Sequence, residues 1–321
     1  MVILAVDSGT TSTRAWVVDD GEVLAAVSTR GGAKDVAIGQ DRSALLTSVR
    51  SVCERALGDS GRSWGDVRAV VAFGMITSEL GLEEVSHLVA PADRASLVRA
   101  MRRVDEALPA PVFLVPGVRS DGPNLAETDF MRGEETEVVG LLSLESVEPP
   151  ILYVSSGSHS KFVGIDGRGR IDWSMTTLSG ELLWALHSQT ILSELVDPMG
   201  ALDDLEAVEQ GARTEERDGF SRALFAARLL NRVRGVGPET CSAFVHGVIA
   251  GSDVRSLRMA LHARPDHPTR VVVAGGSALA RAYRHLLSKE DWLTELEEIE
   301  EPVGALGAWT LFSAASRNGP P

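Results

Sequence analysis

Two short segments of this chain have the composition of an anion-binding turn. The first reads Asp7-Ser8-Gly9-Thr10-Thr11-Ser12, and the second reads Ser155-Ser156-Gly157-Ser158-His159-Ser160-Lys161. Each lies between two apolar runs, which predicts a turn that joins two strands. Backbone N–H groups and hydroxyl groups that converge in such a turn form a nest for phosphate oxygens. The imidazole of His159 could donate a further hydrogen bond to a phosphate or a substrate.

The two turns differ in the charged residue that accompanies them. Asp7 opens the first turn, whereas the matching position of the second turn is Ser155. A single carboxylate beside a phosphate turn suits Mg²⁺, which is held through water and bridging phosphate oxygens. Lys161 closes the second turn as a point charge that could reach a transferring phosphoryl group. We therefore predict a magnesium–polyphosphate site that uses both turns.

Two further segments could complete such a site. The pair Gly275-Gly276 follows an apolar strand, and the absence of side chains lets a ligand approach the backbone. We interpret this pair as the place of an adenosine group. Asp129, Glu134 and Glu135 surround the start of an expected helix, where a carboxylate could accept a proton from an attacking hydroxyl. The alternative is that Asp129 only caps the helix and that the glutamates complement its dipole.

The elements that carry these residues occur twice along the chain. An offset of 148 residues aligns Ile3–Ser12 on Ile151–Ser160 without a gap, and Val70–Gly74 resembles Val272–Gly276. We therefore predict an α/β protein made of two duplicated domains, 1–148 and 149–321, around a nucleotide cleft. Periodicity predicts helices over the following ranges: Ala44–Leu57, Leu97–Leu108, Met131–Leu144, Leu182–Leu195, Phe220–Val233 and Ala243–Leu261. The acidic run Glu290–Glu301 is expected to form the solvated face of a helix.

Composition limits the classes of partner. The chain has 321 residues, of which 44% are hydrophobic, and its net charge is −14. This charge disfavours nucleic acids and acidic membrane surfaces as partners. The two cysteines form no CxxC motif, and no signal peptide or membrane-spanning run is apparent. We therefore expect a cytoplasmic protein that acts on small molecules, with a homodimer as one option for its oligomeric state.

Four motifs in order resemble one kinase family over almost the whole chain. Val6–Trp16, Met131–Thr136, Gly157–Phe162 and Ser179–Leu182 are similar to segments of the 2-dehydro-3-deoxygalactonokinase family, which has the ribonuclease H-like, actin-like ATPase fold. The resemblance implies ATP-dependent phosphorylation of 2-dehydro-3-deoxy-D-galactonate on its 6-hydroxyl in galactonate catabolism. It also favours Glu134 as the base, because a similar glutamate pair opens a helix in related exopolyphosphatases.

The resemblance extends to the binding of the acceptor. The carboxylate of a sugar acid needs a cation, and Arg132 and Arg119 are the nearest candidates along the chain. Ser78 belongs to a segment in which the family usually has Gly-Met-x-Gly-Ser, but Thr77 and Leu82 replace a glycine and an aromatic residue. If this segment lines the acceptor site, these replacements allow a sugar acid that differs from that of the family. The alternatives are a polyphosphate or nucleotide phosphohydrolase of the same superfamily and a non-catalytic ligand sensor.

Overall fold

The computed structural model describes residues 1–10, 12–30, 42–264 and 266–317. These residues form two compact units. The first consists of Met1–Pro149, Asp166–Ser174 and Glu301–Pro321, and the second of Pro150–Ile165 and Met175–Glu300. The division expected from the sequence, 1–148 and 149–321, therefore marks one passage of the chain between units, and the chain returns twice to the first unit.

A six-stranded mixed sheet forms the centre of the first unit, in the order β3-β2-β1-β4-β7-β6. The strand β1 is antiparallel to β2 and parallel to β4, so it is hydrogen-bonded along both edges. Its residues from Val2 to Val6 are buried, as expected for an apolar run in the middle of a sheet. The strands of this sheet are β1 (Val2–Ser8), β2 (Ser12–Asp19), β3 (Glu22–Arg30), β4 (Val67–Gly74), β6 (Arg102–Val104) and β7 (Val112–Leu114).

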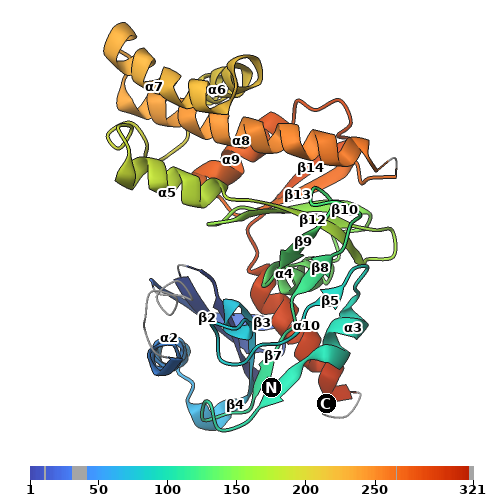
Figure 1. The fold of residues 1–321 in the computed structure, drawn as a ribbon. Coiled ribbons are helices and arrows are strands. Elements are labelled where there is room, and N and C mark those ends of the chain that lie inside the picture. Colours follow the sequence, from blue (N-terminus) through green and yellow to red (C-terminus); the bar gives the residue numbers. More distant parts are fainter. Residues whose placement is uncertain (11, 31–41, 265, 318–321) are drawn as a thin grey trace. The chain divides into compact units, whose positions relative to one another are not determined.

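Helices cover both faces of this sheet. On one face, Leu45, Val49 and Val52 of α2 (Arg42–Ser60) pack in a core with Leu4 and Val6. On the other face lies α10 (Val303–Arg317), which contacts α4 (Glu134–Leu141) and is drawn in red beside it in Figure 1. The remaining elements of this unit are the short helices η1 (Trp64–Asp66), η2 (Met75–Thr77) and α3 (Arg94–Ala100), and a small sheet of β5 (Leu88–Val89), β8 (Val118–Ser120) and β9 (Asp129–Met131).

The crossing of α4 and α10 depends on glycines. A Cβ atom added to Gly140 would overlap the carbonyl oxygen of Val303, and one added to Gly307 would overlap the carbonyl oxygen of Thr136. The two backbones are therefore closer than any side chain at these positions allows. Because α4 begins with the acidic residues predicted to do chemistry, this packing sets their position.

We predict that Gly140→Ala destabilises the protein. The helices would have to separate, which should lower the free energy of unfolding by about 3 kcal/mol, as overpacking typically does. The measurement is urea unfolding followed by circular dichroism. Gly58→Ala is the matched control, since Gly58 lies in α2 and a Cβ atom there would meet nothing within 4 Å. The control should be neutral or stabilising, and equal stabilities of the two variants would contradict the role given to Gly140.

The second unit repeats the topology of the first. Its sheet has the order β12-β11-β10-β13-β14, with β10 antiparallel to β11 and parallel to β13. The strands are β10 (Ile151–Ser155), β11 (Ser160–Ile165), β12 (Ile171–Thr177), β13 (Arg270–Ala274) and β14 (Glu295–Ile299), and the residues of β12 up to Ser174 are counted with the first unit. The helices are α5 (Ser179–Gln189), α6 (Leu205–Asp218), α7 (Phe220–Arg234), α8 (Pro238–His262) and α9 (Ala278–Leu287). In both sheets, the first strand of the unit (β1 or β10) lies between an antiparallel partner from its hairpin (β2 or β11) and a later parallel strand (β4 or β13), as the repeat predicts.

The strand registers correct the gapless alignment of the two repeats. Asp7 pairs with Arg14, whereas Ser155 pairs with Lys161, so the second turn is one residue shorter. Lys161 therefore occupies the ladder position of Arg14. Likewise, Phe73 pairs with Asp7 and Ala274 pairs with Ser155. The structural equivalent of Gly74 is consequently Gly275, and both glycines have a positive φ angle, +81° and +79°.

Four helix predictions were wrong in part, one of them over Leu182–Leu195, where α5 ends at Gln189. The range Leu97–Leu108 contains the end of α3 and then the strand β6, because pairing with β7 extends the sheet there. The helix expected over Met131–Leu144 begins only at Glu134, since Gly133 has a φ angle of +114°. Within Glu290–Glu301, the segment Glu295–Ile299 is the strand β14 beside β13, and Arg270 forms ion pairs with Glu295 and Glu297. Among the described residues, no helix is long and apolar enough to cross a membrane.

Candidate functional site

Asp7 lies at the end of β1 between two glycine backbones. A Cβ atom on Gly74 would come within 2.9 Å of the carboxylate oxygen Oδ1 of Asp7 and within 2.7 Å of the carbonyl oxygen of Ser8. A Cβ atom on Gly133 would lie 3.5 Å from the Cα atom of Gly74. Both glycines have positive φ angles, which other residues rarely adopt. The ends of β1 and β4 and the start of α4 thus meet at the carboxylate of Asp7.

The environment of Asp7 opposes its negative charge. Burial raises the pKa of Asp7 to about 7, the nearby guanidinium of Arg14 opposes this rise, and the charge of Glu137 adds to it. The Arg14 contact is a distant one, with Nη1 3.9 Å from Oδ2 of Asp7. A buried carboxylate with so little compensation gains from a cation that binds beside it. The donor chemistry of this position therefore fits a magnesium ion.

The first polar turn joins β1 and β2 tightly. The N–H group of Gly9 donates to the carbonyl oxygen of Ser12 at 2.8 Å. The hydroxyl groups of Ser8 and Thr13, both fully buried, lie 3.5 Å apart at the base of the turn. Thr10 is part of the turn, and Thr11 lies outside the described residues. The turn follows Asp7 directly, so the candidate phosphate and cation ligands are adjacent.

The two glutamates at the start of α4 have different surroundings. Glu135 is fully buried, and its carboxylate accepts hydrogen bonds from the N–H group of Gly133 at 2.8 Å and from the hydroxyl of Thr136 at 3.1 Å. Burial and the charge of Glu134 raise the pKa of Glu135 to about 8. Glu135 therefore holds the first turn of the helix together. Glu134, by contrast, is only partly buried.

Asp129 and Arg119 lie on the small sheet of the first unit. The carboxylate of Asp129 accepts a hydrogen bond from the hydroxyl of Ser174 at 2.7 Å, so it does not cap α4 as the alternative interpretation supposed; the residue at that position is Gly133. Arg119 forms an ion pair with Asp121 at 3.0 Å, and both side chains are about half exposed. These contacts leave the guanidinium of Arg119 accessible.

Arg132 anchors the segment that contains Ser78. One terminal nitrogen of its guanidinium donates to the hydroxyl of Thr77 at 2.8 Å, and the other donates to the carbonyl oxygen of Val85 at 2.7 Å. Thr77 is fully buried and also donates to the carbonyl oxygen of Gly74 at 3.0 Å. The hydroxyl of Ser78 donates to the carbonyl oxygen of Met75 at 2.7 Å. Arg132 thus connects the start of α4 to the chain around Thr77.

In the second unit, the second polar turn contacts the start of α5. The N–H group of Glu181 donates to the carbonyl oxygen of Ser158 at 2.9 Å. Oε2 of Glu181 also lies 3.8 Å from Nε2 of His159. Lys161 is 6% exposed, and its ammonium group donates to the hydroxyl of Thr176 at 2.6 Å. The predicted phosphate ligands of this unit are therefore grouped at one end of its sheet.

The Gly275-Gly276 pair lies next to the same turn. The hydroxyl groups of Ser156 and Ser277 are 2.9 Å apart, which brings the end of β13 to the second turn. A Cβ atom on either glycine would meet nothing within 4 Å. The space beside this backbone is open, as a nucleotide site requires.

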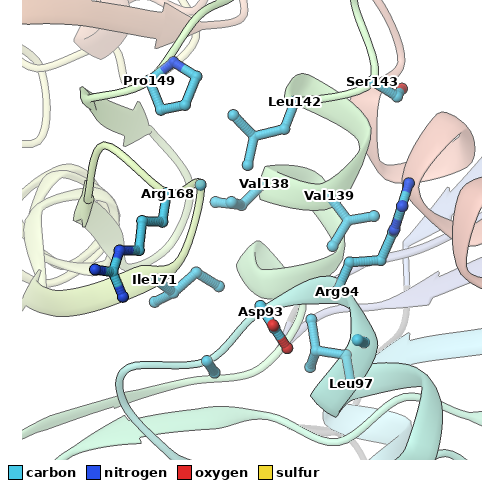
Figure 2. A pocket seen from close by; sticks show the side chains of 13 residues that line it. Asp93, Arg94, Leu97, Val138, Val139, Leu142, Ser143, Pro149, Arg168 and Ile171 are labelled. Atoms are coloured by element: carbon cyan, nitrogen blue, oxygen red, sulfur yellow. The ribbon is translucent and has the colours of Figure 1, made fainter.

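A pocket of about 380 Å³ lies elsewhere in the first unit. Figure 2 shows its walls, which include Leu97 of α3, Val138 of α4, Leu142 just after α4, and Ile171, with Arg94 and Arg168 at its margins. None of the predicted site residues lines this pocket. It contacts α4 beyond the turn that carries the glutamates.

Within the described part of the chain, no three His, Cys, Asp or Glu side chains form a metal cluster. The sequence interpretation did not include Gly74, Gly133 or Thr77 among the site residues. Gly74 could have been identified from the sequence, because it ends an apolar strand and a glycine ends the matching strand of the second repeat.

The chain is similar in sequence to one protein family and in fold to several solved structures. A sequence model described as 2-keto-3-deoxy-galactonokinase matches residues 7–309. A solved candidate 2-dehydro-3-deoxygalactonokinase from Sinorhizobium meliloti is 23% identical, with 98% of each chain covered and a TM-score of 0.74. The activator of 2-hydroxyisocaproyl-CoA dehydratase from Clostridium difficile, solved with bound ADPNP, is 16% identical over 99% of this chain and 97% of its own, with a TM-score of 0.54.

A xylulose kinase from Lactobacillus acidophilus is 12% identical over 99% of this chain and 90% of its own, with a TM-score of 0.54. No curated protein matches the chain significantly. These likenesses confirm the fold expected from the sequence, that of the actin-like ATPases and sugar kinases.

Proposed function

Because the chain belongs to the 2-keto-3-deoxy-galactonokinase family and is a carbohydrate kinase, we propose that it transfers the γ-phosphoryl group of ATP to the 6-hydroxyl of 2-dehydro-3-deoxy-D-galactonate or a closely related sugar acid. The observation that supports this proposal is the meeting of Asp7 with Gly74 and Gly133, directly before the acidic start of α4. It supports the proposal because a Cβ atom on Gly133, the residue before Glu134, would lie 3.9 Å from Oδ1 of Asp7. We also propose that this reaction is a step in the breakdown of galactonate.

In the proposed reaction, the 6-hydroxyl oxygen of the acceptor forms a bond to the γ-phosphorus. The bond between that phosphorus and the β,γ-bridging oxygen breaks, and ADP leaves with its electron pair. Glu134 accepts the proton of the hydroxyl, because its side chain is only partly buried at the start of α4, whereas that of Glu135 is fully buried. Phosphoryl transfer depends mainly on position and charge, so several groups share the task.

We propose a phosphate-binding segment in each unit separately, its polar turn. In the first turn, the backbone and hydroxyl groups are those of Ser8, Gly9, Thr10, Thr11 and Ser12. In the second turn, they are those of Gly157, Ser158 and His159, with the charge of Lys161. Gly275 and Gly276 leave room for the adenosine group. Asp7 would hold Mg²⁺, which neutralises phosphate charge when it is bound.

The acceptor is assigned to the segment around Ser78 and to Arg119 and Arg132. The contacts of Arg132 with Thr77 and Val85 modify this assignment, because they use hydrogen-bond donors that a substrate carboxylate would otherwise need. We therefore propose that Arg132 supplies a fixed positive charge and shapes the acceptor segment, while the accessible Arg119 is the better candidate for a direct contact. Thr77 stands where the family usually has a glycine. Of the properties of the family, we therefore expect the choice of sugar acid to be the one that differs most in this chain.

The test is an assay of ADP release with a panel of 2-keto-3-deoxy sugar acids. We expect ADP release that requires both Mg²⁺ and one of these acids, with a phosphorylated sugar acid as the product in mass spectra. ADP release at the same rate without any acceptor would instead support a phosphohydrolase. Binding of ATP and a sugar acid without turnover would support a ligand sensor. Either result would overturn the proposal.

A further inference from the structure

A buried carboxylate in the second unit has no role in the scheme above. Asp253, in α8, is 7% exposed, and its Oδ2 atom accepts hydrogen bonds from three hydroxyl groups. Tyr283 of α9 donates at 2.5 Å, Thr177 at the end of β12 donates at 3.1 Å, and Ser179 at the start of α5 also donates. Hydrogen bonds to a buried carboxylate are stronger than those between neutral groups. Asp253 therefore links α5, α8, α9 and β12.

Through Ser179, Asp253 determines the position of the first turn of α5. This helical turn contacts the second polar turn directly, since the N–H group of Glu181 donates to Ser158. A Cβ atom on Gly180 would overlap the carbonyl oxygen of Gly157, so the two backbones are in contact. A shift of Ser179 must therefore shift the backbone of the second polar turn.

Through Tyr283, Asp253 also determines the position of α9. Ser277 caps this helix by accepting a hydrogen bond from the N–H group of Ala280 at 3.1 Å, and its hydroxyl meets that of Ser156. The aromatic ring of Tyr283 packs edge-on against Phe162, which follows Lys161 in β11. The Asp253 cluster thus supports the second polar turn from α5, α9 and β11 at once.

We propose that Asp253 and Tyr283 are positioning residues for the binding of nucleoside di- and triphosphates. They hold the second polar turn, Ser155–Lys161, at a fixed place relative to Gly275-Gly276, so that one ligand can contact the phosphate turn and the glycine pair together. This inference rests on the proposed function, because it assigns the turn to nucleotide phosphates. Neither side chain needs to touch the nucleotide.

The cluster has a specific expected effect on ligands. When the turn is held less firmly, a ligand must order it on binding, and only ligands with phosphates gain from that ordering. Loss of a hydrogen bond to a charged group corresponds to roughly a tenfold weakening. We therefore expect affinity for ADP and ATP to fall about tenfold and affinity for adenosine to stay within about twofold.

The experiment compares Asp253→Asn and Tyr283→Phe with two matched controls in the full chain. Tyr153→Phe removes the hydroxyl of the other tyrosine of the chain, which is also fully buried in the second unit. Glu215→Gln neutralises another buried carboxylate, one that is paired with Arg255 at 2.5 Å. Calorimetry gives the affinities for ADP and adenosine, and hydrogen exchange with mass spectrometry reports on the second polar turn.

We expect faster exchange of the amides in Ser155–Lys161, weaker ADP binding and a higher KM for ATP in both test variants. The KM for the sugar acid should be unchanged in both test variants. The two control variants should keep the wild-type amide exchange, ADP affinity and KM for ATP. Wild-type ADP affinity and wild-type exchange in the folded variants would overturn the inference. Tyr283→Phe decides the matter if Asp253→Asn does not fold. If no sugar acid is phosphorylated, the proposed function fails, but the exchange comparison still tests the positioning role.

Discussion

Asp7→Asn is expected to lower kcat roughly a thousandfold, the upper range for loss of a group that stabilises charge in a transition state. The amide keeps the size of the side chain, so Gly74 and Gly133 can still pack against it. It loses the negative charge that we assign to magnesium binding. The measurement is steady-state kinetics at saturating ATP and several magnesium concentrations. Asp59→Asn, on the exposed surface of α2, is the control and should be fully active.

The same substitution should stabilise the metal-free protein at alkaline pH. Because the pKa of Asp7 is raised from 3.8 to about 7, the folded chain holds a proton between these values that the unfolded chain releases. The stability of the wild type therefore falls as the pH rises through this window, and the full cost applies above about pH 7. We expect Asp7→Asn to gain on the order of 3 kcal/mol at pH 8 and nothing near pH 4.

Thermal unfolding in the presence of a chelator, measured at both pH values, checks this. Equal stability of wild type and variant at pH 8 would show that the carboxylate is not disfavoured by its surroundings. Wild-type turnover in Asp7→Asn would remove the proposed role in magnesium binding, whatever its stability.

The second large effect is expected for Glu134→Gln. A positioned general base typically contributes about a hundredfold or more to the rate, so kcat should fall by that amount while the KM for ATP changes little. Glu135→Gln should lower kcat less than tenfold, because the side chain of Glu135 is fully buried and its carboxyl group accepts hydrogen bonds from Gly133 and Thr136.

Single-turnover kinetics with each variant separates the chemical step from product release. Glu145→Gln, an exposed carboxylate beyond α4, is the matched control. An unchanged rate in Glu134→Gln, together with a large loss in Asp129→Asn or Glu135→Gln, would transfer the role of base to that residue.

Much of this arrangement could be read from local patterns in the sequence. Alternating turns and apolar runs identified both hairpins, and the similarity of Ile3–Ser12 to Ile151–Ser160 predicted the repeated topology. Such features depend on neighbours along the chain, and the sequence records them directly. The position of Asp7 at the end of a buried strand could likewise be predicted from the local sequence.

What the sequence did not predict depends on packing between distant segments. The guanidinium of Arg132 donates hydrogen bonds to Thr77 and Val85, and no local pattern in the sequence predicts these contacts. The hydroxyl groups around Asp253 come from three different elements, so their convergence appears only in the fold. The helix predicted over Leu97–Leu108 was wrong beyond Ala100, because Arg102–Val104 pair with β7 at the edge of the sheet. Tertiary pairing overrode local preference there.

The position of α10 has a consequence for the synthesis of the chain. Its glycines pack against Thr136 and Gly140, so one face of the first sheet remains uncovered until residues beyond Val303 have been made. A ribosome-bound chain that ends before this helix exposes Phe73 and Phe113, which are buried in the finished protein. The part of the protein that is translated first is therefore completed last, and truncation after Glu300 would leave α4, which begins at Glu134, without the helix that it packs against.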